Sequence, residues 1–284
     1  MGGDRGTALL RRVLAGSGQP VADLDRADGG PPGVLAGTAA DGPLRHAVRL
    51  PPRSGQHVPW PGWVPPSVRQ AFVACGVTEP WSHQVAAAEL AHAGTDVVVA
   101  TGTASGKSLA YQLPVLARFA ADRRATALYL SPTKALAADQ LRALAALDLP
   151  DVRPAALDGD TSTEARDWAR RHGRWLFSNP DMLHRSVLPR HGRWAAFLRR
   201  LQYLVIDECH TYRGVFGSHV ALLVRRLLRI CARYGARPTI VLASATVAEP
   251  SAVTAVTGRP VNREANWAGS ATVAEASTIV GRAP

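Results

Sequence analysis

Short apolar runs alternate with longer amphipathic segments from residue 81 onward, and this alternation constrains the fold more than any other feature. We predict strands at five apolar runs, 96–100, 125–130, 174–177, 203–206 and 239–243. Helices fit around and between them, at 83–92, 106–121, 134–146, 162–171 and 216–234. Apolar strands separated by helices indicate an α/β fold, a parallel sheet covered by helices on both faces. Ligands of such sheets bind at the carboxyl ends of the strands.

The segments on either side of this alternation have a different composition. Residues 1–66 hold ten of the 21 prolines and twelve of the 25 glycines, which indicates a loosely ordered lead-in. A short helix is expected from Ser67, with Gly76 at its end. Beyond about residue 260 no periodic pattern remains. We therefore expect three parts: a lead-in at 1–54, a folded domain at 55–260, and a tail or truncated connection at 261–284.

The positive charge of the chain favours a polyanionic partner. The formal net charge is +11, and the isoelectric point is about 10.7. Residues 161–200 hold nine arginines against three acidic residues, and residues 213–237 hold six arginines and no acidic residue. Such runs are typical of nucleic-acid-binding surfaces. The alternative is a solvated, arginine-rich surface without a partner.

Cysteine use and hydropathy bear on the compartment. The three cysteines, Cys75, Cys209 and Cys231, form neither a CxxC pair nor an even disulfide set, so we expect a reducing, cytoplasmic location. No stretch approaches the ~18 uncharged apolar residues of a membrane helix. The N-terminus lacks the apolar run of a signal peptide, and we expect no membrane partner.

One of only two lysines, set against 31 arginines, follows the first predicted strand at position 107. Lysine is a slim point charge that fits a tight phosphate cradle where a guanidinium fork does not. Lys107 is predicted to reach the β- and γ-phosphates of a nucleotide, and the Ser108 hydroxyl to hold Mg²⁺. Backbone N–H groups would cradle the phosphates at Thr103, Ala104, Ser105 and Gly106. The strict phosphate-loop pattern has glycine where Thr101 stands, and the alternative is a simple turn into a helix.

Two carboxylates follow the buried run 203–206 directly. Asp207 is predicted to hold Mg²⁺ and Glu208 to polarise the attacking water, the two roles that phosphoryl transfer requires. His210 is expected to couple this site to a neighbouring loop through the hydroxyls of Ser244 and Thr246. A helix N-cap is the alternative for the acidic pair. Metal binding by Cys209 and His210 is disfavoured, since no second Cys/His pair lies at ligand spacing.

Seven segments, in this order, resemble the first RecA-like domain of superfamily-2 helicases of the DEAD/DEAH-box type. The segments are 81–84, 101–108, 131–137, 158–161, 178–184, 207–210 and 244–246. The stretch from His210 to Val220 resembles more narrowly the type-four RecQ-related helicases of bacteria and fungi with a Cys-rich C-terminal domain. The resemblance covers roughly residues 55–260 and implies a P-loop NTPase with ATP and Mg²⁺ as cofactors.

The resemblance also implies roles for individual residues. Gln84 would recognise adenine through its amide, and Glu208 would act as the general base. Two loops would grip the sugar-phosphate backbone of one strand, formed by Pro132, Thr133 and Lys134 and by Ser178, Asn179 and Pro180. For Lys134 the alternative is a solvated cation at a helix start. Backbone contacts of this kind depend on salt and little on base sequence.

We therefore expect the ATP-binding domain of an ATP-dependent DNA helicase, in which hydrolysis drives movement on a nucleic-acid strand, in DNA repair. Its partner would be single-stranded or partly duplex nucleic acid, with DNA favoured. A second RecA-like domain, which supplies the arginine finger in such enzymes, is expected but not found in this chain. One alternative is thus a nucleotide- and nucleic-acid-binding fragment with negligible turnover. Another is an unrelated P-loop ATPase, which would lack the dependence on Gln84 for adenine.

Overall fold

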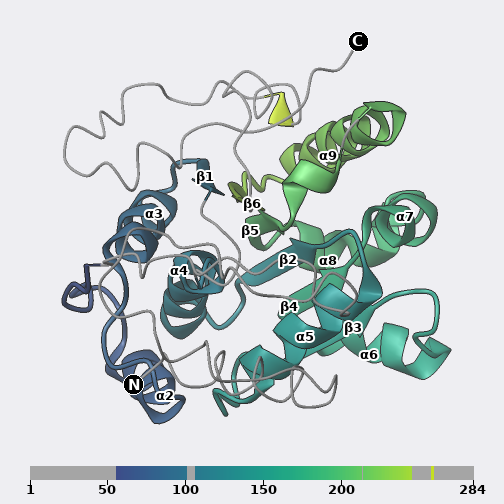
Figure 1. Ribbon diagram of the computed structural model, residues 1–284. Helices are drawn as coiled ribbons and strands as arrows, with labels where there is room; N and C mark the ends of the chain where they lie inside the picture. Colours follow the sequence, from purple (N-terminus) through teal and green to yellow (C-terminus); the bar gives the residue numbers. More distant parts are fainter. Residues whose placement is uncertain (1–55, 101–105, 213, 245–256, 259–284) are drawn as a thin grey trace, which may run out of the picture. The chain divides into compact units, whose positions relative to one another are not determined.

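The computed structural model describes residues 56–100, 106–212, 214–244 and 257–258, all within one unit that begins at Gln56. Figure 1 shows these residues as a parallel sheet between two layers of helices. The expected lead-in at 1–54 and the tail at 261–284 lie outside the described residues, as do Thr103, Ala104, Ser105 and Thr246.

Six parallel strands form the sheet in the order β1-β6-β5-β2-β4-β3. The strands are β1 (Val97–Ala100), β2 (Thr126–Leu130), β3 (Pro154–Leu157), β4 (Trp175–Ser178), β5 (Leu201–Ile206) and β6 (Thr239–Ser244). At the centre, Leu130 pairs with Ile206 of β5 and with Ser178 of β4. Because every pairing is parallel, the carboxyl ends of all six strands meet along one edge. The predicted α/β class with a parallel sheet is confirmed.

Helices cover both faces of the sheet, as the continuous apolar character of the strands predicts. They are α2 (Pro66–Ala74), α3 (Ser82–His92), α4 (Ser108–Ala121), α5 (Lys134–Ala145), α6 (Thr163–His172), α7 (Pro180–Met182), α8 (Ala195–Leu198) and α9 (Gly214–Arg233). A π-helical turn at Leu183–Val187 and 3-10 turns at His191–Trp194 and Cys209–Thr211 complete the described elements. The long predicted helices agree with these bounds to within a few residues.

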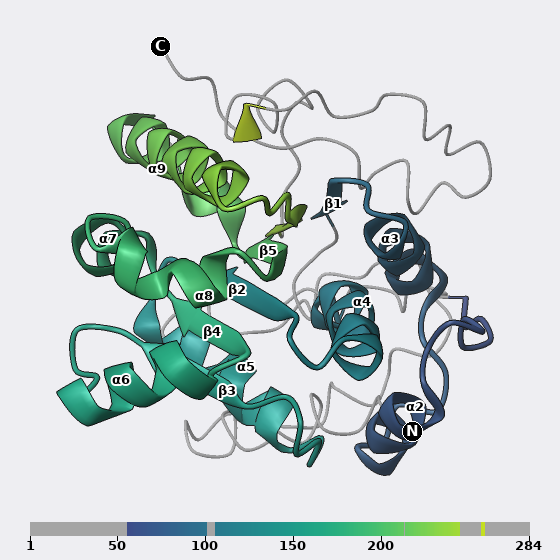
Figure 2. The same cartoon turned by 180° about the vertical axis from the view of Figure 1, so that it is seen from behind.

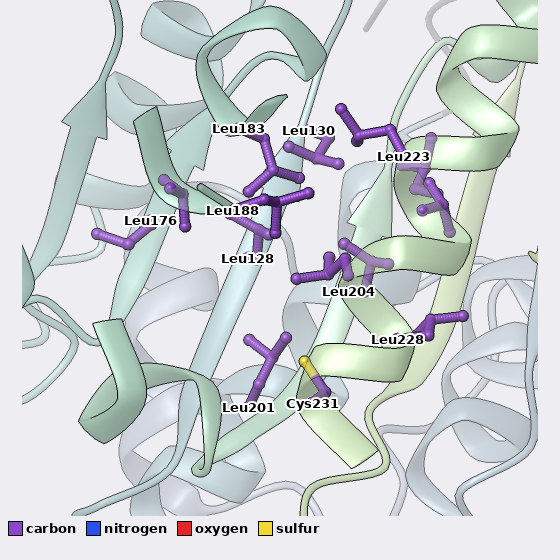
Figure 3. Close-up of a cluster of buried hydrophobic side chains, with 14 of the residues drawn as sticks. Leu128, Leu130, Leu176, Leu183, Leu188, Leu201, Leu204, Leu223, Leu228 and Cys231 are labelled. Carbon is purple, nitrogen blue, oxygen red and sulfur yellow. The ribbon is translucent and has the colours of Figure 1, made fainter. Parts of the chain in front are cut away.

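Alternation along β2 divides the core into two clusters. Ala127 and Tyr129 face the cluster formed with α2 to α5, whereas Leu128 and Leu130 face the cluster formed with α6 to α9. Figure 3 shows leucines of the second cluster between β2, β5 and α9. Figure 2 shows from behind that α3 and α4 lie on the opposite side of the sheet from α9 and α7. Both faces are thus buried, and only the strand ends remain for ligands.

Two parts of the fold were not predicted. Strand β3 begins with Pro154 and pairs only with β4, and three of its four residues are incompletely buried, so it lacks a strong apolar run. The one-turn elements between Pro180 and Leu198 were also missed, because a single turn shows no helical periodicity. Among the described residues, no helix is long and apolar enough to cross a membrane.

Arg174 departs from the expectation that the arginine-rich run 161–200 is a solvated or nucleic-acid-binding surface. Its side chain is buried. Its guanidinium donates to four backbone carbonyls, at Phe119, Ala125, Asp151 and Asp122. Burial lowers the pKa of Arg174, although the guanidinium stays charged. This arginine joins the end of α4 to the segments that precede β2, β3 and β4, and it is part of the core.

Candidate nucleotide and nucleic-acid site

The strand order sorts the predicted motifs into two halves of one sheet edge. The phosphate loop follows β1, Ser244 ends β6 and the acidic pair follows β5. The loops predicted to grip nucleic acid follow β2 and β4, and the segment 158–161 follows β3. Strands β5 and β2 are neighbours, so the border between the halves lies between Asp207 and Ser131. The residues predicted for nucleotide chemistry therefore lie beside those predicted to bind a nucleic-acid strand, along one edge of the sheet.

Gln84 holds the described end of the phosphate loop. The side chain of this first-turn residue of α3 is buried. Its Oε1 accepts from the Trp81 N–H at 2.8 Å, and its Nε2 donates to the Gly106 carbonyl at 2.9 Å. Gly106 adopts a φ of +70°, and a Cβ there would lie 2.5 Å from that Nε2. The left-handed backbone therefore favours glycine at this position, and an added Cβ would displace the Gln84 amide.

The N-terminus of helix α4 positions the two residues of the loop that are predicted to bind phosphate and Mg²⁺. Lys107 is the N-cap and Ser108 the first residue of α4, so both lie where a helix N-terminus favours phosphate. Ten of the fourteen residues of α4 are buried, which anchors this helix in the core. The described part of the loop thus has the form of a phosphate site.

Asp207 is buried at the end of β5, where its carboxylate is oriented by two hydrogen bonds. Tyr129 donates its hydroxyl to Oδ2 at 2.5 Å, and the Glu208 backbone N–H donates to Oδ1 at 2.8 Å. A carboxylate has about four acceptor positions, so lone pairs remain for a cation or its water. Asp207 and Ser108 together offer the hard oxygen donors that Mg²⁺ prefers, and they fit this ion.

The residues after Asp207 form a compact polar corner. Glu208 has a φ of +47°, a left-handed conformation that is costly for a residue with a side chain and is typical of functional sites. His210 Nδ1 lies 3.1 Å from Glu208 Oε2 and 3.1 Å from Ser244 Oγ. His210 thus brings together the ends of β5 and β6, the arrangement expected of a coupling residue. Burial raises the pKa of the Cys209 thiol, which keeps it out of the thiolate form that binds metals.

Lys134 stands at the other half of the edge, as the first residue of α5. Thr133 caps this helix by accepting from the Leu136 N–H at 3.3 Å. Lys134 Nζ lies 2.6 Å from Asp160 Oδ2, and this hydrogen bond raises the pKa of Lys134. The predicted phosphate contact therefore has an acidic partner. Asp160 belongs to the predicted segment 158–161, but its pairing with Lys134 was not expected from the sequence.

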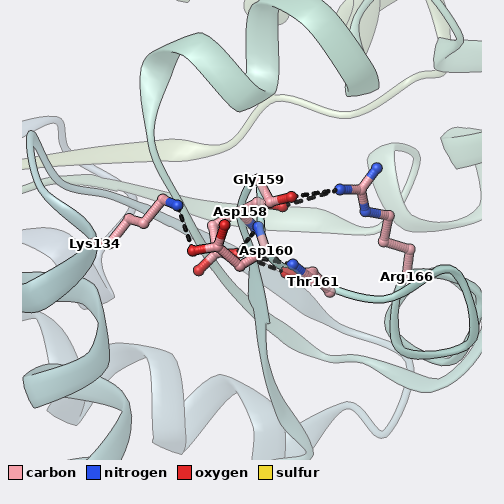
Figure 4. A network of polar contacts seen from close by, with 6 residues as sticks. All are labelled: Lys134, Asp158, Gly159, Asp160, Thr161 and Arg166. Atoms are coloured by element: carbon pink, nitrogen blue, oxygen red, sulfur yellow. Dashed lines mark hydrogen bonds and ion pairs between the residues drawn. The ribbon is translucent and has the colours of Figure 1, made fainter.

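The turn that presents Asp160 is rigid (Figure 4). Asp158 Oδ1 accepts from the N–H groups of Asp160 and Thr161 at 2.8 and 3.0 Å. Arg166 of α6 donates to the carbonyls of Asp158 and Gly159. These bonds fix the backbone of the turn, so only the Asp160 side chain is free to turn away from Lys134.

The side chains of the loop after β4, which is predicted to grip the sugar-phosphate backbone, make local hydrogen bonds. Ser178 is buried, and its hydroxyl donates to the Leu157 carbonyl at 2.7 Å, which joins β4 to β3. Asn179 Oδ1 accepts from the Met182 N–H at 2.9 Å and caps α7, whose first residue Pro180 is buried. The Ser178 hydroxyl is thus unavailable for nucleic acid, and this loop has only its backbone and the Asn179 amide nitrogen to offer a phosphate.

A parallel sheet with a phosphate loop after its first strand and an Asp-Glu pair after a central strand defines a RecA-like P-loop nucleotide-binding domain. Residues 81–253 match the family described as DEAD/DEAH box helicase, and the chain belongs to this family. It is 44% identical over 214 residues to the ATP-dependent helicase YprA of Bacillus subtilis, covering 74% of this chain and 29% of YprA. The expected helicase family is thus confirmed.

Two further proteins support the same placement. The chain is 47% identical over 156 residues to the ATP-dependent helicase HRQ1 of Saccharomyces cerevisiae, covering 53% of this chain and 14% of HRQ1. Its structure resembles the crystal structure of the DUF1998 helicase MrfA bound to DNA and AMPPNP, with a TM-score of 0.71 and 42% identity. That match covers 74% of this chain and 30% of MrfA. The chain therefore spans less than a third of the length of these relatives.

Proposed function

We propose that this chain is the ATP-binding domain of an ATP-dependent helicase that moves along a DNA strand. The observation that supports the proposal is the strand order: the motifs predicted for nucleotide binding follow β1, β6 and β5, and the loops predicted for nucleic acid follow the adjacent β2 and β4. The crystal structures of MrfA with DNA support DNA as the partner. A role in DNA repair belongs to the same proposal and is suggested by the resemblance to the type-four RecQ-related helicases.

In this function, Lys107 binds the β- and γ-phosphates of ATP, and Gln84 recognises adenine while it holds Gly106. Ser108 and Asp207 bind Mg²⁺, which when bound neutralises charge on the phosphate oxygens. Glu208 accepts a proton from the attacking water, and His210 relays the state of the site to the end of β6 through Ser244.

Lys134 binds a phosphate of the nucleic acid in the other half. To do so, Lys134 gives up its ion pair with Asp160 and pairs with a phosphate of the nucleic-acid strand instead. This exchange is feasible because both side chains of the ion pair are exposed to water. The arginines of 161–200 extend the positive surface, except for Arg174, which is structural. We further propose that residues 1–284 alone bind ATP and nucleic acid with negligible turnover, since the described residues form a single RecA-like sheet.

The two lysines allow a direct test of the two halves. The purified chain is titrated with a fluorescent ATP analogue in the presence of Mg²⁺ and, separately, with a labelled single-stranded DNA. Lys107→Ala should weaken nucleotide binding more than about tenfold, the equivalent of one charge-assisted hydrogen bond. Lys134→Ala should weaken DNA binding and leave the nucleotide titration unchanged. Equal losses in both titrations for the two variants would refute the division into halves.

Adenine recognition is tested separately from the halves. The chain should prefer ATP to GTP and UTP in competition with the labelled analogue, and Gln84→Ala should abolish the preference. An unrelated P-loop ATPase would show no preference that depends on Gln84. Multiple turnovers of ATP by residues 1–284 alone would contradict the proposal of negligible hydrolysis.

A further inference from the structure

Two buried tyrosines lie directly behind the proposed Mg²⁺ site. Tyr129 is on β2 and Tyr111 is on α4, and both side chains are almost completely buried. Their ring centroids lie 5.9 Å apart. A buried hydroxyl is unfavourable unless it is hydrogen-bonded, so phenylalanine would suffice if these rings only filled space. The hydroxyls therefore call for a role beyond packing.

The hydroxyls contact both candidate Mg²⁺ ligands. Tyr129 donates to Oδ2 of Asp207 at 2.5 Å, from the neighbouring strand of the sheet. The Tyr111 oxygen accepts from the Ser108 hydroxyl, and the Tyr111 ring packs beside that of Tyr129. A phenol has a single O–H donor, and Tyr129 directs it to the Asp207 carboxylate.

The same pair reaches the strand-binding half. Tyr111 donates its hydroxyl to Gln140 Oε1 at 2.9 Å. Gln140 lies on α5, the helix that Lys134 begins. The contacts thus run from α5 through Tyr111 and Tyr129 to Asp207, across the β2–β5 border that separates the two halves.

We propose that Tyr129 and Tyr111 are positioning residues that orient Asp207 and Ser108 for Mg²⁺ and connect this metal site to helix α5. Outer-sphere hydrogen bonds of this type orient metal ligands, and their loss commonly costs about 10–100-fold in metal affinity. A nucleic-acid strand bound at Lys134 shifts helix α5. Because Gln140 lies on this helix, its movement is transmitted through the two tyrosines to the Asp207 carboxylate. By thermodynamic reciprocity, Mg²⁺ bound with nucleotide also acts on α5.

The chain contains a matched control for removal of one buried hydroxyl. Tyr212 is also buried next to the acidic corner, yet its hydroxyl has no hydrogen-bond partner among the residues that the structure describes. Tyr212→Phe therefore removes a phenolic oxygen from the same region without removing a bond. Any effect specific to Tyr129→Phe must then come from the hydrogen bond to Asp207.

The test measures how much Mg²⁺ residues 1–284 need to bind a fluorescent ATP analogue. Tyr129→Phe should raise the half-saturating Mg²⁺ concentration about tenfold, while nucleotide binding in EDTA is unchanged. Tyr111→Phe should shift it in the same direction, and Tyr212→Phe should match the wild type. Unchanged Mg²⁺ dependence in Tyr129→Phe would overturn the proposal, and so would an equal loss in EDTA, which would indicate a structural role alone.

A fourth variant, outside the buried tyrosines, tests the proposal if a core tyrosine variant fails to fold. Gln140→Ala alters a partly exposed helix position and should raise the Mg²⁺ requirement through Tyr111, by less than Tyr129→Phe. A wild-type Mg²⁺ requirement in this variant would disprove the connection to α5.

The inference rests on the proposed function, and different results would refute each of them. Wild-type chain that binds no nucleotide, or Lys107→Ala that binds it normally, would refute the proposed function itself.

Discussion

Replacing Gly106 by alanine tests the contact that holds the phosphate loop before any nucleotide is present. The backbone at Gly106 is left-handed, and an added Cβ would lie 2.5 Å from Nε2 of Gln84. This amide is buried and bonded both to the Gly106 carbonyl and to the Trp81 N–H. The methyl group must therefore displace the amide or the loop.

The expected magnitude has two parts. Left-handed backbone costs an alanine about 1–2 kcal/mol. Displacement of the Gln84 amide removes two hydrogen bonds, each contributing about 0.5–1.5 kcal/mol. Gly106→Ala should therefore lower the free energy of unfolding by about 2–5 kcal/mol, which urea denaturation of the nucleotide-free chain measures.

Gly235 provides the matched control. Its φ is +79°, and no atom of the residues that the structure describes lies within 4 Å of an added Cβ. Gly235→Ala should therefore show the backbone cost alone. In a Gln84→Ala background the effect of Gly106→Ala should fall to that same value, because the clash and both bonds are already gone. Equal losses for the two glycine variants in the wild-type background would refute the reasoning.

Two further predictions concern charged side chains. Asp160→Asn should tighten single-stranded DNA binding by less than about tenfold, because the pair that it frees is exposed. Asp151→Asn, which releases the distant Arg123, controls for net charge and should change little. Arg174→Ala should lower the free energy of unfolding by about 3 kcal/mol or more, because four carbonyl contacts lose their donor. Thermal unfolding tests it, and a loss below about 1 kcal/mol would contradict it.

Local sequence patterns were enough to predict most strands of the sheet and the types of residue at the carboxyl ends of those strands. The apolar runs before Thr101 and Asp207 each ended where the structure ends a strand, because burial on both faces leaves a signal in consecutive residues. Strand β3 left no such signal, since its Pro-Ala-Ala sequence at an exposed edge needs no long apolar run. Asp160 lies in the predicted segment 158–161, but its ion pair with Lys134 was not predicted, because the strand before it left no pattern to place it beside α5.

The sequence by itself determined the α/β class, the helicase family and the chemistry available at each strand end, since these depend on residue type and local periodicity. Only the tertiary structure decided which ends are neighbours. Strand order placed Tyr129 beside Asp207, 78 positions away along the chain, and turned the Ser178 hydroxyl toward β3. Such pairings arise from packing between distant segments, and no local pattern encodes them. The connection between the two halves of the site is therefore a property of the folded sheet.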